Sequence, residues 1–114
     1  MERLVRPALR AILEAIDGIE NATLGKTKDD YASDWLLRHG VQRGIEVISE
    51  ACRRIPPDLQ ALQAHIPWAD IAGIGNILRH EYHRISDNVI WTVVTDRLAP
   101  LKRAVEALDA ALEE

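Results

Sequence analysis

Apolar residues recur every three or four positions along most of this chain, which is the spacing that places them on one face of an α-helix. One such set falls between residues 4 and 21 and comprises Leu9, Ile12, Leu13, Ile16 and Ile19. A longer set falls between residues 34 and 55 and comprises Leu37, Val41, Ile45, Ile48, Cys52 and Ile55. The sequence offers no convincing strand, because no β-branched run alternates with polar residues. The pattern therefore predicts an all-α fold, an antiparallel helical bundle.

Prolines and capping residues predict where the helices begin and end. Pro7 is tolerated in the first turn of a helix, so the first regular helix is expected to start near it. Thr27 precedes two acidic residues and is expected to be the N-cap of a short helix. Prolines at positions 56 and 57 end the long helix, and Asp87 is expected to cap a later one. The last helix starts near Pro100, and one face of it carries Leu101, Val105, Leu108 and Leu112.

The length and composition suit one small domain. With 114 residues, the chain can bury a real core, and we expect residues 1–114 to form a single helical domain. No apolar run approaches the ~20 residues of a membrane span, and the first residues lack the apolar region of a signal peptide. We therefore expect a cytoplasmic protein with no membrane partner. Cys52 is the one cysteine, which excludes an intrachain disulfide and a thiol-rich zinc site, and it is expected to be an inert buried thiol.

Cationic and titratable side chains are densest in "GNILRHEYHRIS", residues 75–86. The net charge of −4 argues against broad, non-specific binding to nucleic acid, so no DNA partner is expected, but a local basic site is compatible with it. A helical wheel places the apolar residues of this region on one side, namely Ile71, Ile74, Leu78 and Ile85. The other side carries Asn76, Arg79, His80, His83 and Arg84, which we call the polar strip. Tyr82 falls at the apolar edge.

The polar strip has a simple interpretation as a solvated helix face. On the polar side of the long helix, His39, Arg43 and Glu50 are expected to form a solvated or subunit-facing strip. Two features favour a functional role for the polar strip. It consists mainly of Arg, His and Asn, and its adjacent cations repel one another unless an anion is bound. A metal site is not expected, since the histidines of "HEYH" are three residues apart and have no obvious third ligand. A nucleophilic triad is not expected either, because the sequence has no serine or cysteine in a nucleophile-elbow motif. Phosphate chemistry fits better, because arginine donates paired hydrogen bonds to a phosphodiester and histidine can move a proton near neutral pH.

Several motifs occur in the order found in a known family. They are a Pro-Trp pair, an Ile-x-Gly-x-x-Asn run, a His-x-Tyr and a Trp before the last helix. On these motifs the chain resembles the HepT-like family of the HEPN superfamily, over residues 11–56 and 66–101. The resemblance implies a homodimeric all-α toxin of a toxin–antitoxin pair, acting as a metal-independent ribonuclease at a cleft between the motif helices of two subunits. It also implies an MntA-like minimal nucleotidyltransferase as antitoxin, which transfers AMP to the motif tyrosine.

The resemblance assigns roles to the polar strip. His80 matches the motif histidine, a candidate acid and base, and Asn76 matches the polar residue after the motif arginine. The arginine itself would stand at position 75, where this chain has Gly75, and either Arg79 or Arg84 could supply the guanidinium instead.

We therefore expect catalysis from Asn76, Arg79 and His80, and RNA phosphate binding by His83 and Arg84. Tyr82 is the expected AMP acceptor, and neither a metal nor a cofactor is expected. The alternative is a non-catalytic helical module that binds a nucleotidyltransferase or a nucleotide.

Overall fold

The computed structural model describes residues 2–81 and 85–113. Its helices are α1 (Glu2–Thr23), α2 (Lys28–Ser33), α3 (Trp35–Cys52), α4 (Pro57–Ala61), α5 (Trp68–Glu81), α6 (Asp87–Thr92) and α7 (Leu98–Glu113). A π-helical segment, η2 (Val93–Arg97), joins α6 to α7. Within these two ranges there is no strand, and the all-α prediction is confirmed. None of the described helices is long and apolar enough to cross a membrane.

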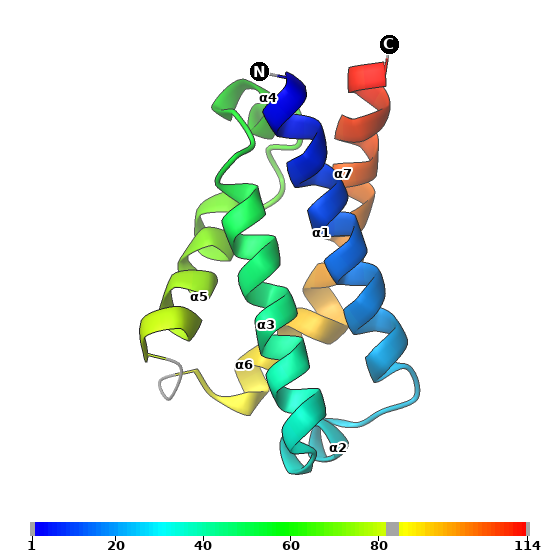
Figure 1. Ribbon diagram of the computed structural model, residues 1–114, viewed down its shortest axis with the longest axis vertical. Helices are drawn as coiled ribbons and strands as arrows, with labels where there is room; N and C mark the ends of the chain where they lie inside the picture. Colours follow the sequence, from blue (N-terminus) through cyan, green and yellow to red (C-terminus); the bar gives the residue numbers. More distant parts are fainter. Residues whose placement is uncertain (1, 82–84, 114) are drawn as a thin grey trace.

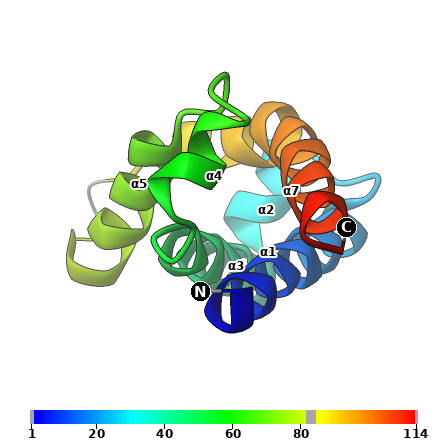
Figure 2. The ribbon, with the colours of Figure 1, turned by 90° about the horizontal axis from the view of Figure 1, so that it is seen from above.

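The helices α1, α3, α5 and α7 run alternately down and up the long axis of the molecule (Figure 1). α3 packs against α1 on one side and against α5 on the other, and α7 packs against α1. Seen from above, the four helices surround the interior, with α5 at the outer edge of the group (Figure 2). The two chain ends lie at the same end of the bundle, opposite α2 and α6 (Figure 1).

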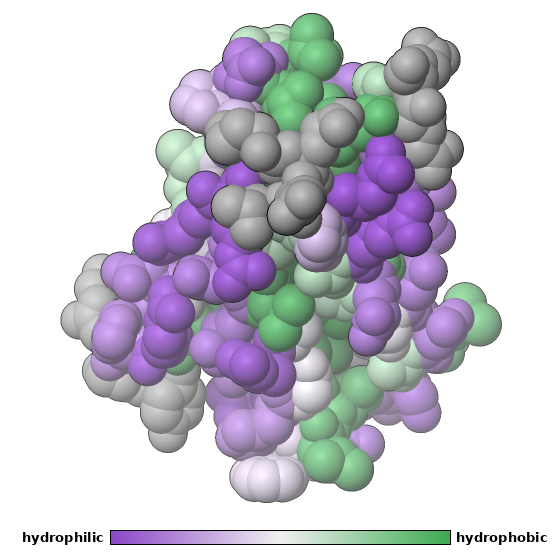
Figure 3. Space-filling view, turned by 45° about the horizontal axis from the view of Figure 1, so that its top comes forward, coloured by the Kyte–Doolittle hydropathy of each residue, from purple (hydrophilic) through white to green (hydrophobic). Residues whose placement is uncertain are grey.

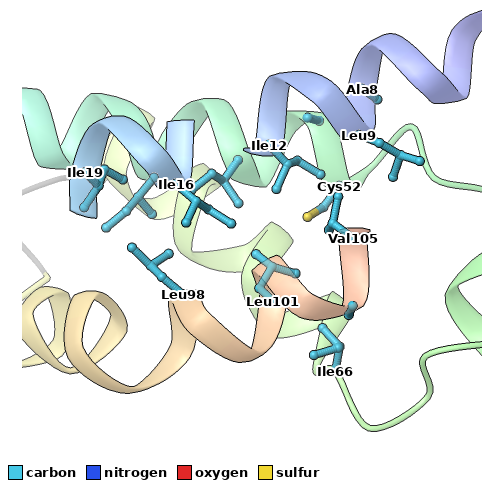
Figure 4. Close-up of a cluster of buried hydrophobic side chains, with 14 of the residues drawn as sticks. Ala8, Leu9, Ile12, Ile16, Ile19, Cys52, Ile66, Leu98, Leu101 and Val105 are labelled. Atoms are coloured by element: carbon cyan, nitrogen blue, oxygen red, sulfur yellow. The ribbon is translucent and has the colours of Figure 1, made fainter. Parts of the chain in front are cut away.

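The core consists of the apolar faces that the sequence periodicity predicts. Ile12 and Ile16 of α1 have no exposed surface, and Val105 of α7 is equally buried. On α3, four members of the predicted face are buried, namely Val41, Ile45, Ile48 and Cys52, and Ile55 just after the helix is buried as well. Side chains of α1 and α7 point toward one another across this interior, with Cys52 among them (Figure 4). Burial raises the pKa of the Cys52 thiol to about 12, so the group stays protonated and unreactive at neutral pH.

Two of the predicted helix starts are wrong, and one is confirmed. α1 begins at Glu2, so Pro7 lies inside the helix. Val5 and Ala8 are buried beside it, and that packing compensates for the one backbone hydrogen bond that proline cannot donate. The N-cap of α6 is Ser86, whose hydroxyl accepts from the Val89 amide, and Asp87 is the first helical residue. Thr27 caps α2 in a reciprocal capping box with Asp30, as expected.

Candidate functional site

The described members of the polar strip, Asn76, Arg79 and His80, lie on α5, and two contacts with the rest of the bundle hold that helix. At its start, the buried Trp68 donates its indole N–H toward the carbonyl oxygens of Gln60 and Gln63, at 3.2 and 3.1 Å. One turn further on, the hydroxyl of Ser49 in α3 donates to the Ala72 carbonyl oxygen at 2.9 Å. The start of α5 is therefore attached to α4 and the turn after it, and the next turn of α5 is attached to α3.

Gly75 lies at a close contact between α5 and α3. The residue is buried, and a Cβ atom built on it would overlap the side chain of Ser49. A larger residue at position 75 would push the two helices apart. Position 75 therefore faces α3, and an arginine could not occupy it without moving one of the helices.

The outer side of α5 carries Asn76, Arg79 and His80, all exposed, while Leu78 between them is buried. This division between a polar and an apolar side agrees with the helical wheel. Hydrophilic residues gather over this part of the molecule, on the left of the space-filling view (Figure 3). The predicted site residues Tyr82, His83 and Arg84 lie outside the described residues, so their contacts with these three side chains are not defined.

A second set of charged side chains reaches the polar strip from α3. Glu50 Oε2 lies 3.8 Å from Nη2 of Arg79 and 3.9 Å from Nε of Arg53. Arg53 also donates from Nη2 to the Ala72 carbonyl oxygen of α5, at 3.1 Å. All three charged side chains are close to half exposed, at 44–47%. Ion pairs this exposed contribute less than about 1 kcal/mol each, so a stronger anionic ligand can displace the carboxylate.

Sequence reasoning missed Glu50 and Arg53 as part of this site. Glu50 was placed in a solvated or subunit-facing strip on α3, separate from the polar strip of α5. A single-helix wheel cannot show which residues of another helix lie beside it, and the sequence separation of Arg53 and Arg79 hides their proximity. The available signal was the pair of small residues, Ser49 and Gly75, at which two helices can approach closely.

An apolar groove of about 670 Å³ lies between α1 and α3. Small residues form its floor, and they include Ala11, Ala15, Gly18, Gly40 and Gly44. Leu36 and Val47 line it, and Leu36 is 73% exposed. The neighbouring Trp35 is 71% exposed, unlike the half-buried Trp91 and the buried Trp68, so it is not a core residue.

The described part of the chain contains no group of three His, Cys, Asp or Glu side chains that could hold a metal ion. The exposed side chains that it carries on α5 are those of Asn76, Arg79 and His80. Together with the fold, this describes a small all-α protein with exposed polar and cationic side chains on one helix.

Comparison with known proteins assigns the chain to a family. A family model described as "Ribonuclease HepT-like" matches residues 12–108, and the chain belongs to this HepT-like family. A "Probable ribonuclease HepT" from Thermococcus cleftensis is 33% identical over 95% of this chain and 98% of its own length. A "Putative RNase" from Caldanaerobacter subterraneus is 27% identical over 90% of this chain and 92% of its own length.

One relative is longer than this chain, and its name includes a second activity. The protein from Methanocaldococcus jannaschii called "Gamma-glutamylcyclotransferase and putative RNase" is 34% identical over 92% of this chain. The match spans only 47% of that protein, so this chain corresponds to about half of it. The comparison with solved structures gave no match.

Proposed function

We propose that this protein is a metal-independent endoribonuclease, the toxin of a toxin–antitoxin pair. The observation that carries the proposal is the exposed group of Asn76, Arg79 and His80 on α5, in a chain of the HepT-like ribonuclease family. These side chains offer a proton-transfer group and a guanidinium on one rigid surface. RNA cleavage without a metal needs both of them.

The proposed reaction is an internal transesterification of RNA. A histidine takes the proton of a ribose 2′-hydroxyl, and the 2′-oxygen forms a bond to the adjacent phosphorus. The bond from phosphorus to the 5′-oxygen then breaks, and the leaving oxygen takes up a proton from a second acid. Arg79 stabilises the negative charge that develops on the phosphate, and Asn76 can donate a further hydrogen bond.

A homodimer would supply the second acid. His80 lies in the last turn of α5 on an open surface, so a second subunit can bring another copy of His80 to the same RNA phosphate. One copy then acts as base and the other as acid. The exposed Leu36 beside an apolar groove supports dimer formation, since a lone subunit leaves this surface in water.

We propose further that an MntA-like minimal nucleotidyltransferase is the antitoxin and transfers AMP to Tyr82. The reaction joins the tyrosine oxygen to the α-phosphorus of ATP and releases pyrophosphate. Tyr82 follows His80 by two residues, so the added nucleotide would bring its phosphate and bulk to the polar strip. His83 and Arg84, which we propose as RNA phosphate contacts, would be blocked by the same group.

The test is an RNA cleavage assay with the purified protein in the presence of chelator. We expect wild-type protein to cleave RNA, and His80→Ala to lose about 100- to 10,000-fold of that activity, which is the usual contribution of acid–base catalysis. His65→Ala is the matched control, because His65 is also exposed but lies before α5 begins. Cleavage that survives His80→Ala, or that requires an added metal ion, would contradict the mechanism.

A second function is favoured by the glycine at position 75. The family motif has an arginine there, and in this chain Gly75 is buried against Ser49. If no other guanidinium takes its place, the protein is a non-catalytic module that binds a nucleotidyltransferase or a nucleotide. Absence of cleavage by wild-type protein, with retained binding of the nucleotidyltransferase, would support this second function.

A further inference from the structure

The contact between α3 and α5 brings two arginines from distant parts of the sequence to one carboxylate. We propose that Arg53 and Arg79 form a clamp for a single RNA phosphate, and that Glu50 occupies this clamp when RNA is absent. We call these three residues the arginine clamp. The inference rests on the proposed ribonuclease function, and it adds a binding residue from a helix outside the family motif.

The geometry shows that both guanidinium groups can reach one anion. Nε of Arg53 and Nη2 of Arg79 approach the same oxygen atom, Oε2 of Glu50, within 3.9 Å. Arg53 is the C-cap residue of α3, whereas Arg79 lies in α5, so two separate elements supply the guanidinium groups. A phosphodiester has two non-bridging oxygens and can accept hydrogen bonds from both arginines at once.

Arg53 is also held in place by the backbone of α5. Its Nη2 donates to the Ala72 carbonyl oxygen, which in turn accepts from the Ser49 hydroxyl. This contact fixes one edge of the guanidinium and leaves other N–H groups for a ligand. Arg53 therefore loses less side-chain entropy on binding a phosphate than an arginine without such a contact would lose.

The bound carboxylate resembles the expected ligand but is held weakly. The distances of 3.8 and 3.9 Å from Glu50 to the two arginines are longer than those of good charge-assisted hydrogen bonds. Two guanidinium groups and one carboxylate leave a net positive charge at the clamp. An RNA phosphate can therefore replace Glu50 and gain shorter contacts.

Gly75 makes the clamp geometrically feasible. Because it has no side chain, Ser49 lies directly against α5, and Arg53, one helical turn after Ser49, reaches across to Ala72. Gly75 itself supplies no guanidinium, but the close helix contact that it permits brings the guanidinium of Arg53 to α5. Arg53 then shares with Arg79 the phosphate-binding role that the sequence left open between Arg79 and Arg84.

The test measures binding of a single-stranded RNA at several salt concentrations. Each phosphate contact contributes about 0.7 to the slope of log affinity against log salt for single strands. We expect Arg53→Gln to reduce that slope by about 0.7 and to weaken binding roughly 10-fold, the loss expected for a hydrogen bond to a charged group. Arg53→Lys keeps the charge and is expected to keep the slope while losing part of the affinity.

Two further variants serve as controls. Lys102→Gln removes a cation that also bridges helices, since Lys102 of α7 pairs with Asp17 and Glu20 of α1. It lies away from α5 and is expected to change RNA binding little. Glu50→Gln removes the competing carboxylate and is expected to raise RNA affinity about 2- to 5-fold, matching the small energy of an exposed ion pair.

The outcomes separate the clamp from the ribonuclease proposal. If wild-type protein binds and cleaves RNA, and Arg53→Gln behaves like Lys102→Gln, the clamp is wrong and the ribonuclease proposal stands. If wild-type protein neither binds nor cleaves RNA, the proposed function itself is wrong. A drop in RNA affinity for Glu50→Gln as large as that for Arg53→Gln would also contradict the clamp, because it would make Glu50 a required partner of the RNA and not its competitor.

Discussion

The side chain of Ser49 fills the space that a Cβ atom at position 75 would need, so these two residues define the distance between α3 and α5. The hydroxyl of Ser49 also bonds to the Ala72 carbonyl oxygen, one turn before Gly75. The separation of the two helices is thus set by steric contact and by a hydrogen bond at nearly the same point. The positions of Glu50, Arg53 and Arg79 depend on both the steric contact and the hydrogen bond.

The first prediction compares two glycines of α5. Gly75→Ala is expected to lower the free energy of unfolding by about 1–3 kcal/mol, because overpacking against Ser49 outweighs the better helix propensity of alanine. Gly73→Ala is the control, since Gly73 is exposed and a Cβ there meets nothing within 4 Å. It is expected to raise the free energy of unfolding by about 0.5–1 kcal/mol. Urea unfolding of both variants measures the difference, and equal stabilisation by both would contradict the close contact.

The second prediction concerns stability at alkaline pH. Burial raises the pKa of Cys52 from 9.0 to about 12. Between these values the unfolded chain loses the thiol proton while the folded chain keeps it, so the free energy of unfolding falls as the pH rises. Cys52→Ala is expected to reduce this fall, at a cost of roughly 1 kcal/mol at neutral pH from the cavity it leaves.

Tyr31 provides the control for this measurement. Its pKa is also raised by burial, but from 10.0, so its contribution begins at higher pH than that of Cys52. Tyr31→Phe is therefore expected to change the pH profile only above about pH 10. A pH profile of Cys52→Ala that is parallel to that of wild type from pH 9 to 10 would rule out the thiol as the cause.

The third prediction is a homodimer. Light scattering at micromolar concentration is expected to give about twice the chain mass of 12.8 kDa. Leu36→Glu is expected to shift the mass toward a single chain, because it puts a charge beside the apolar groove of α1 and α3. Leu24→Glu is the control, since Leu24 is 82% exposed in the loop after α1 and does not line the groove. A wild-type monomer at this concentration would remove the basis for a composite site.

The fourth prediction is the position of AMP modification. The chain has two tyrosines, and Tyr31 is fully buried between Gln42 and Trp91, where no transferase can reach it. Co-expression with the nucleotidyltransferase is expected to add AMP mass to the peptide that contains Tyr82. Tyr82→Phe is expected to abolish the addition. Wild-type protein recovered unmodified from an active, ATP-supplied pair would refute the proposal.

Helical periodicity was enough to predict the fold and the two sides of α5. Ile12, Ile16 and Ile48 are buried because each lies on the apolar face of its own helix, which a sequence shows directly. Helix boundaries were less accurate. Packing of Val5 and Ala8 extends α1 past Pro7, and local capping rules do not include that tertiary contact. The π-helical turn at residues 93–97 was also not predicted, because no local signal marks it.

The candidate site was predicted only in part, because a sequence shows the faces of a single helix but not how two helices pack. Asn76, Arg79 and His80 belong to one helix, so their spacing alone places them on its exposed side. Arg53 and Glu50 reach the same site from α3, and their position depends on how two helices pack. Gly75 was interpreted as the loss of an arginine, while the structure shows that it is the contact point that brings α3 close.

The position of the two chain ends has a consequence for fusion proteins. Both ends lie at one end of the bundle, whereas His80 is in the last turn of α5, which points toward the opposite end (Figure 1). A domain attached to either terminus would therefore begin at the end of the bundle that is opposite the last turn of α5. For the same reason, a fluorescent reporter or an immobilising tag can be joined to either end without covering the exposed histidine.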